Sequence, residues 1–255
     1  MRTFLVAGIS IGLATLLVTA TARGQLVSEF QPPKANCCLQ GAAQQLADQL
    51  QDWNQLGRYH QDDERLKSQS AQPGRVVFMG DSITDGWNLA SFFAGKPYVN
   101  RGIGGQTTPQ MLVRMFPDVI DLHPAALIIL AGTNDIGGNT GPETPTMVEE
   151  NLQAMTELAQ KHDIKVILCS VLPVSDYTQY NRTTKRPPAD ILKINAWIKQ
   201  YAAEAHTIFA DYYAALADAQ GMLRQGYSED GVHPNAKGYA VLAPVAEAAI
   251  EKALK

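Results

Sequence analysis

The sequence is poor in cysteine and nearly balanced in charge. Its 255 residues include three cysteines, and 21 basic against 25 acidic residues give a formal net charge of −4. The charges are interspersed, without the basic patch that binds nucleic acid or an anionic membrane surface. Three cysteines cannot all pair, and their spacing matches no zinc site. The composition therefore argues against a nucleic-acid-binding protein and against a zinc module.

The cysteines fall into two settings. Cys169 ends the apolar run Val166-Ile167-Leu168-Cys169 and is predicted to be a small, buried core residue. Cys37 and Cys38 are adjacent, which leaves three states open: a strained vicinal disulfide, pairing with other chains, or free thiols.

Long apolar stretches are missing, apart from one near the start. Arg2 precedes an apolar stretch from Phe4 to Val18, and Ala20-Thr21-Ala22 has the small-x-small form of a signal-peptidase site. Residues 1–22 are therefore predicted to be a signal peptide, which implies a secreted or periplasmic protein. A membrane anchor is the weaker alternative, because the stretch is near the lower length limit for spanning and contains glycine and serine. We expect a soluble mature protein without a stable membrane anchor.

Several motifs of known chemistry are absent. The sequence has no His-Glu-x-x-His pair, and its glycine-rich turn is not followed by the Gly-Lys-Ser/Thr of a phosphate-binding loop. The six-residue dinucleotide fingerprint is not completed either. We therefore predict neither a metal nor an organic cofactor.

Predicted strands and helices alternate along the chain, which is typical of a parallel sheet covered on both faces. The pattern predicts a three-layer α/β/α sandwich with a five-stranded, mostly parallel sheet. The expected strands are Arg75–Met79, Tyr98–Asn100, Ala126–Ala131, Lys165–Val171 and Thr207–Asp211. A final helix is expected over Asn235–Leu254, and residues 140–145 and 176–188 are expected to be loops that line a cleft.

The region between the signal peptide and the first strand is expected to be helical. The runs Ala42–Leu56 and Arg58–Leu66 look amphipathic and should pack on the α/β domain as an extension. The chain is thus divided into a signal peptide (1–22), a helical extension (23–73) and an α/β domain (74–255).

One serine has the surroundings of a nucleophile. Ser82 lies in Gly80-Asp81-Ser82, directly after the apolar run Val76–Met79, and Asp230 and His233 follow far downstream, three residues apart. A serine hydroxyl needs an imidazole to take its proton and a carboxylate to orient that imidazole. The plainer alternative is that Gly-Asp-Ser forms a simple turn with a helix cap, and that His233 is an ordinary loop residue.

Two further segments end at polar residues. The glycine-rich turn that contains Gly105 follows a short strand, and Asn134 in Gly-Thr-Asn-Asp follows a buried one. A backbone N–H at the first and a side-chain amide at the second would serve as donors to an oxyanion. Taken singly, the first also fits a phosphate cradle and the second a turn or helix cap. Asp81 and Asp135 are assigned capping and turn roles.

With these residues in place, the chain resembles the GDSL-type lipases and esterases, also called SGNH hydrolases. The resemblance spans about residues 74 to 250 and rests on four blocks in the family's order: Ser82, Gly105, Asn134, and Asp230 with His233. The sequence departs from the family name, with Ile83-Thr84 where the name has leucine. The neighbourhood of Ser82 is not Gly-x-Ser-x-Gly, which disfavours the nucleophile-elbow hydrolases.

The resemblance implies a flavodoxin-like fold and a secreted serine esterase. Ser82, His233 and Asp230 would form the catalytic triad, and Ser82, Gly105 and Asn134 the oxyanion hole. Small-molecule or carbohydrate esters would be the substrates. The loops are rich in Gly, Thr, Asn and Pro and there is no long apolar lid, which favours a short acyl or acetyl group on a polar alcohol. The alternatives are an inactive glycan- or lipid-binding module on the same scaffold, and a lysophospholipase or thioesterase.

Overall fold

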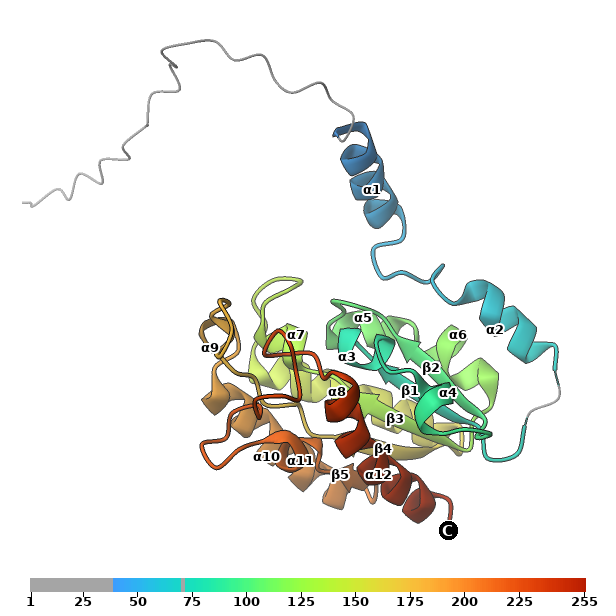
Figure 1. The fold of residues 1–255 in the computed structure, drawn as a ribbon. Coiled ribbons are helices and arrows are strands. Elements are labelled where there is room, and N and C mark those ends of the chain that lie inside the picture. The colour runs from blue at the N-terminus through green and yellow to red at the C-terminus, as the bar shows by residue number, and fades with distance from the viewer. Residues whose placement is uncertain (1–38, 70–71) are drawn as a thin grey trace, which may run out of the picture. The chain divides into compact units, whose positions relative to one another are not determined.

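A computed structural model describes residues 39–69 and 72–255 of the chain. Its centre is a five-stranded sheet in the order β2-β1-β3-β4-β5, with every neighbouring pair parallel (Figure 1). The strands are β1 (Val76–Gly80), β2 (Tyr98–Gly102), β3 (Ala126–Leu130), β4 (Lys165–Cys169) and β5 (Ile208–Ala210). Each lies within two residues of its predicted range, and the predicted α/β sandwich is confirmed.

The sheet is buried on both faces because its strands are almost continuously apolar. Side chains alternate along each strand, so Val77 and Met79 join one core cluster while Val76 and Phe78 join the other. Cys169 lies in the second cluster, 1% exposed, as predicted.

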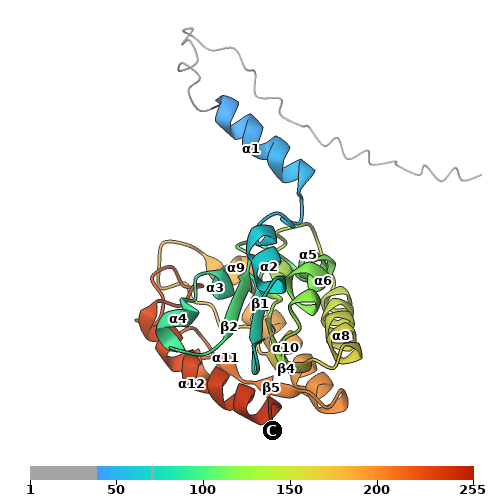
Figure 2. The same cartoon turned by 90° about the vertical axis from the view of Figure 1, so that its right-hand side faces the viewer.

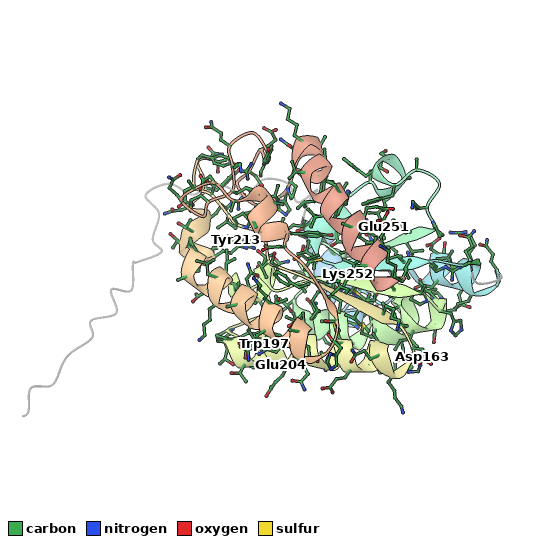
Figure 3. All side chains as sticks on the ribbon, turned by 90° about the horizontal axis from the view of Figure 1, so that it is seen from below. Asp163, Trp197, Glu204, Tyr213, Glu251 and Lys252 are labelled. Atoms are coloured by element: carbon green, nitrogen blue, oxygen red, sulfur yellow. The ribbon has the colours of Figure 1, made fainter. Side chains whose placement is uncertain are left out.

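Helices cover the two faces separately, as Figure 2 shows. The first face is covered by α5 (Thr108–Val113), α6 (Met115–Asp118), α8 (Pro145–Lys161) and α10 (Pro188–Glu204). The second face is covered by α4 (Leu89–Phe92), α11 (Tyr212–Leu216) and α12 (Ala236–Ala253). Seen from below in Figure 3, α10 with Trp197 and α12 with Lys252 flank the β5 edge. The predicted final helix is α12.

Shorter elements connect these layers. They are α3 (Ser82–Asp85), the 3-10 helix η1 (Ile120–Leu122), α7 (Thr133–Ile136) and α9 (Arg182–Lys185). The prediction of a loop over residues 176–188 is thus wrong at α9. The carboxylate of Asp176 accepts hydrogen bonds from the backbone N–H (2.9 Å) and the hydroxyl of Thr183. Asp176 thus provides an acceptor for a backbone N–H in the first turn of this one-turn helix, although it lies seven residues before Thr183 in the sequence.

In the part of the chain that the structure describes, two helices precede the sheet: α1 (Leu39–Gln51) and α2 (His60–Lys67). Residues 44–255 form one compact unit. Within it, the guanidinium of Arg101 on β2, 2% exposed, pairs with Asp63 at 2.7 Å and Asp62 at 2.8 Å on α2. No helix among residues 39–69 and 72–255 combines the length and the apolar character that crossing a membrane requires. Cys37, Cys38 and residues 1–22 lie outside the described residues.

Candidate active site

The sheet register brings three of the predicted site residues to one edge. Gly80 at the end of β1 pairs with Gly102 on one side and with Leu130 on the other, so β1, β2 and β3 end level. Ser82, Gly105 and Asn134 follow these strand ends within four residues. The carboxyl edge of a parallel sheet is where ligands of open α/β folds bind.

Ser82 is the first residue of α3, in a turn held from several sides. The Asp81 carboxylate caps this helix by accepting a hydrogen bond from the backbone N–H of Ile83 at 2.9 Å. The Tyr239 hydroxyl on α12 donates to the backbone oxygen of Ile83 at 2.7 Å. Burial raises the pKa of Asp81 to about 6, although the bond from Ile83 opposes this rise. The capping role predicted for Asp81 is present in the structure.

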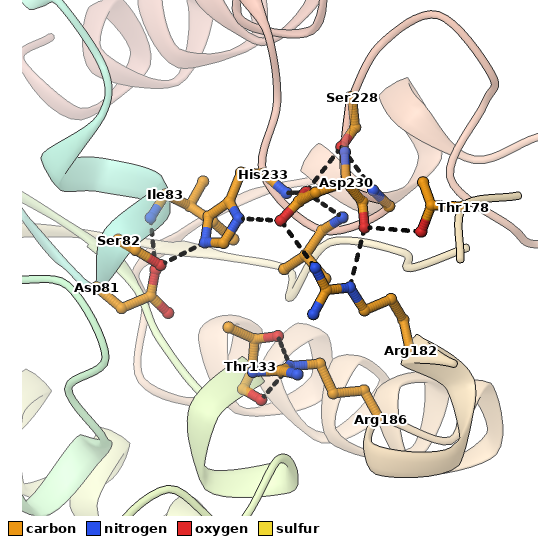
Figure 4. Close-up of polar contacts among 12 residues, drawn as sticks. Asp81, Ser82, Ile83, Thr133, Thr178, Arg182, Arg186, Ser228, Asp230 and His233 are labelled. Atoms are coloured by element: carbon orange, nitrogen blue, oxygen red, sulfur yellow. Dashed lines mark hydrogen bonds and ion pairs between the residues drawn. The ribbon is translucent and has the colours of Figure 1, made fainter. Parts of the chain in front are cut away.

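Ser82, His233 and Asp230 form one hydrogen-bonded chain (Figure 4). Ser82 Oγ lies 2.8 Å from His233 Nε2, and His233 Nδ1 lies 2.7 Å from Asp230 Oδ2. An ionised carboxylate only accepts, so Nδ1 carries the ring hydrogen and Nε2 accepts from the serine hydroxyl. The imidazole therefore has the tautomer that a general base needs.

Asp230 organises its own turn. Its Oδ1 accepts hydrogen bonds from the backbone N–H groups of Val232 and His233, both at 2.9 Å. Its Oδ2 accepts from the His233 ring and, at 3.1 Å, from Nη2 of Arg182. Burial alone would raise the pKa of Asp230, but the bonds from His233 and Val232 outweigh it and hold that pKa well below its usual range. The carboxylate is thus ionised beside the imidazole.

The two remaining predicted residues lie on adjoining loops. Gly105 has a φ of 81°, a left-handed conformation that favours glycine. Asn134, 4% exposed, donates from Nδ2 to the backbone oxygen of Gln106 at 3.1 Å, which ties its amide to the Gly105 loop. A Cβ on Gly104 would lie 3.8 Å from Cβ of Ser82, so this loop passes beside the serine. All five predicted site residues are gathered at the carboxyl edge of the sheet.

Asp135, the neighbour of Asn134, has the turn-bonding role that was predicted for it. Its Oδ1 accepts a hydrogen bond from the backbone N–H of Thr108 at 2.8 Å. This bond joins the loop after β3 to the start of α5. Among residues 39–69 and 72–255, His, Cys, Asp and Glu side chains form no group of three or more that would hold a metal ion.

Sequence reasoning missed two arginines that contact the site. Arg182 donates from Nε to the backbone oxygen of Asp230 at 2.9 Å, besides its contact with the carboxylate. Arg186 donates from Nη2 to Oδ1 of Asn134 at 3.0 Å and from Nε to the backbone oxygen of Thr133, also at 3.0 Å. The only sequence signal was three cations within residues 182–186 of a mildly acidic chain.

A buried network behind the site was also missed. Arg114, fully buried, donates from Nη2 to the backbone oxygen of Gly80 at 3.0 Å and from Nε to Oε1 of Gln106 at 2.6 Å. It also pairs with Asp118 at 2.7 Å. This one side chain therefore joins the end of β1 to the loop after Gly105.

Comparison with known proteins gives the site its context. The model of the GDSL-like lipase/acylhydrolase family matches residues 78–241, well over half of the chain. A crystal structure of a proposed acylhydrolase from Bacteroides fragilis NCTC 9343 is 42% identical, with a TM-score of 0.75, and the match covers 80% of this chain and 99% of that one.

Two curated relatives are more distant. Esterase TesA of Pseudomonas aeruginosa is 26% identical over 190 residues, covering 66% of this chain and 84% of that protein. The uncharacterized lipoprotein YqeF of Bacillus subtilis is 34% identical over 118 residues, which span 39% of this chain and about half (49%) of the lipoprotein. The chain belongs to the GDSL-like lipase and acylhydrolase family and is a hydrolase that acts on esters.

Proposed function

We propose that this chain is a serine esterase that cleaves short acyl esters of polar alcohols through an acyl-enzyme. The observation that carries the proposal is the hydrogen-bonded chain from Ser82 Oγ through the His233 ring to Asp230 Oδ2, with separations of 2.8 and 2.7 Å. Distances of this size are within reach for direct proton transfer.

The reaction has two halves. Ser82 Oγ bonds to the ester carbonyl carbon while His233 Nε2 takes the hydroxyl proton; the carbon–oxygen bond to the alcohol then breaks, and that proton passes to the departing alcohol oxygen. A water molecule next gives a proton to His233 and attacks the acyl-enzyme, which releases the acid and returns the proton to Ser82. Asp230 stabilises the imidazolium in both halves.

The negative charge that develops on the ester carbonyl oxygen needs hydrogen-bond donors close to that oxygen. In this proposal they are the backbone N–H groups of Ser82 and Gly105 and the Asn134 side-chain amide. The bond between Asn134 and the backbone of Gln106, and the passage of Gly104 beside Ser82, support this assignment. Losing one such donor typically costs about 2.7–4 kcal/mol of transition-state stabilisation.

The surroundings of the triad support a small, polar substrate. The His233 side chain is 46% exposed, so the reacting atoms face an open site. The polar side chains that hydrogen-bond to Asp230 and Asn134 include Arg182, Arg186 and Ser228.

The domain division and the export of the chain remain proposals that rest on the sequence. In this proposal residues 1–22 are removed on export, 23–73 form the extension and 74–255 the esterase domain. The mass of the protein recovered from the periplasm or the medium tests the cleavage: loss of residues 1–22 is expected, and retention of the apolar stretch would contradict it.

The experiment for the catalytic proposal compares Ser82→Ala with Ser91→Ala, an exposed serine on α4. Wild type and Ser91→Ala should hydrolyse p-nitrophenyl acetate and react with a fluorophosphonate probe, whereas Ser82→Ala should do neither. A series from acetyl to palmitoyl esters then tests the acyl preference. Undiminished turnover by Ser82→Ala would remove this serine from the nucleophile role, and a maximum at long acyl chains would overturn the short-chain preference.

A further inference from the structure

A small basic cavity lies beside the candidate active site. Its volume is about 270 Å³, and it is lined by Gln179, Tyr180, Asn181, Arg182, Lys185 and Arg186. Three of these six residues are cations and none is acidic, although the whole chain has a net charge of −4. All six come from α9 and its flanking residues, so one short segment builds the cavity.

Two of the residues that line the cavity also contact proposed catalytic residues. Arg182 contacts the carboxylate of Asp230 at 3.1 Å, and Arg186 contacts the amide oxygen of Asn134 at 3.0 Å. Figure 4 shows both side chains reaching from the α9 segment toward the site, Arg182 beside Asp230 and Arg186 beside Thr133. A group bound between the arginines would therefore belong to a substrate whose ester lies at the serine.

The positive charge in the cavity is poorly compensated. The hydrogen bonds of the half-buried Arg186 go to neutral oxygens of Thr133 and Asn134. Across residues 39–69 and 72–255, no carboxylate lies within 4.0 Å of a charged nitrogen of Arg186 or Lys185. Burial, and then the charge of Arg182, lowers the pKa of Arg186, although the more distant charges of Asp81 and Asp230 oppose this change. A partly desolvated cation without an anionic partner is costly unless a ligand supplies the charge.

We infer that this cavity binds an anionic group, a carboxylate or a phosphate, carried by the ester substrate. Arginine presents planar donors that match both groups, and the bonds of Arg182 and Arg186 use Nε and Nη2, which leaves Nη1 of each for a ligand. The volume suits a charged group on a short linker rather than a long acyl chain. This inference rests on the proposed function, because it names a part of the substrate that the same site would cleave.

The test compares kcat/KM for pairs of an anionic and a neutral ester. The two esters have the same shape in the first two pairs, and in the third pair the neutral ester lacks the phosphate. The p-nitrophenyl monoester of glutarate is matched with p-nitrophenyl 5-methylhexanoate, and 3-acetoxypropanoate with isopentyl acetate. The acetyl ester of glycerol 3-phosphate is matched with acetylglycerol. The first pair places a carboxylate on the acyl side, the second a carboxylate on the alcohol side, and the third a phosphate on the alcohol side.

In at least one pair, we expect wild type to prefer the anionic ester by about tenfold, as for one or two charge-assisted hydrogen bonds in a partly exposed site. Lys185 contacts neither Asp230 nor Asn134 in the hydrogen bonds described above, so Lys185→Gln should reduce this ratio without disturbing their orientation. The matched control is Lys193→Gln on the exposed side of α10, which should keep the wild-type ratio.

Two results would overturn the inference alone: equal kcat/KM within all three pairs, or the same ratio in wild type and Lys185→Gln while neutral esters are still hydrolysed. Absence of turnover on every ester would instead contradict the proposed function, and the anion site with it.

Discussion

Arg186 donates a hydrogen bond from Nη2 to Oδ1 of Asn134 at 3.0 Å, which fixes the orientation of that side-chain amide. A guanidinium only donates, so it faces the amide oxygen and turns Nδ2 away from itself. Nδ2 then donates one hydrogen to the backbone oxygen of Gln106 at 3.1 Å. Its second hydrogen is then available for the substrate oxyanion of the proposed mechanism.

The first prediction tests this dependence on a neutral ester. Arg186→Met should lower kcat for p-nitrophenyl acetate by about tenfold, less than the roughly 10²–10³-fold loss expected for Asn134→Ala. Because the arginine acts through the amide, the double variant should be no slower than Asn134→Ala alone. Steady-state kinetics of the four proteins provide the cycle, and additive losses would contradict the orienting role.

The second prediction concerns Asp230. Asp230→Asn should lower kcat by about 10⁴-fold, because an amide at this position no longer enforces the ring tautomer that leaves Nε2 free to accept a proton. The matched control is Glu229→Gln, which removes one negative charge from the adjacent residue and keeps an oxygen to accept the bond from Asn235 Nδ2, 2.9 Å in wild type. The control should retain wild-type kcat. Similar losses in both variants would show that charge, rather than the position of Asp230, is responsible.

The fold was predictable because its buried strands carry a strong local signal. The apolar run Val76–Met79 and the run that ends at Ala131 are each followed by glycine and polar residues, which indicates where each strand ends. Once the strands are parallel and in register, the residues that follow their ends must meet at one edge. The gathering of Ser82, Gly105 and Asn134 could therefore be predicted without coordinates.

The basic contacts of the site could not be predicted in this way. Arg182 reaches Asp230 across 48 residues of sequence, and Arg186 reaches Asn134 across 52. No periodicity or spacing in the sequence predicts such contacts, because they depend on how one loop packs over the strand ends. The cap of α9 is similar, since Asp176 stabilises a helix that local propensity does not mark.

The third prediction concerns the pH dependence of stability. Glu143 and Asp135 line the same cavity. Burial first, and then the charge of Asp135, raises the pKa of Glu143 to about 7. In the unfolded chain the pKa of this carboxyl is about 4.3. The folded protein therefore holds an extra proton between these values, and its free energy of unfolding falls as the pH rises through that window.

Glu143→Gln should remove this loss, because a glutamine side chain stays uncharged at every pH. Thermal unfolding from pH 5 to 8.5 should show a flatter pH dependence than wild type, and a higher Tm above pH 7. The control Glu150→Gln removes the same charge from an exposed position on α8 and should follow the wild-type curve. Parallel curves for Glu143→Gln and wild type would contradict a raised pKa of Glu143 in the folded protein.

The last prediction uses two glycines with the same backbone conformation and different surroundings. Gly231, between Asp230 and His233, has a φ of 82°, and a Cβ there would overlap the backbone oxygen of Ser175. Gly226 has a φ of 89° and open space around it. Alanine in the left-handed conformation costs about 1–2 kcal/mol at either position. Urea unfolding should therefore show a fall of that size in the free energy of unfolding of Gly226→Ala, with kcat retained.

Gly231→Ala must also displace the turn that carries the imidazole, and a shift of about 1 Å can lower kcat by roughly 100-fold. Equal kcat in the two variants would mean that the turn absorbs the extra methyl group without moving His233 away from Ser82.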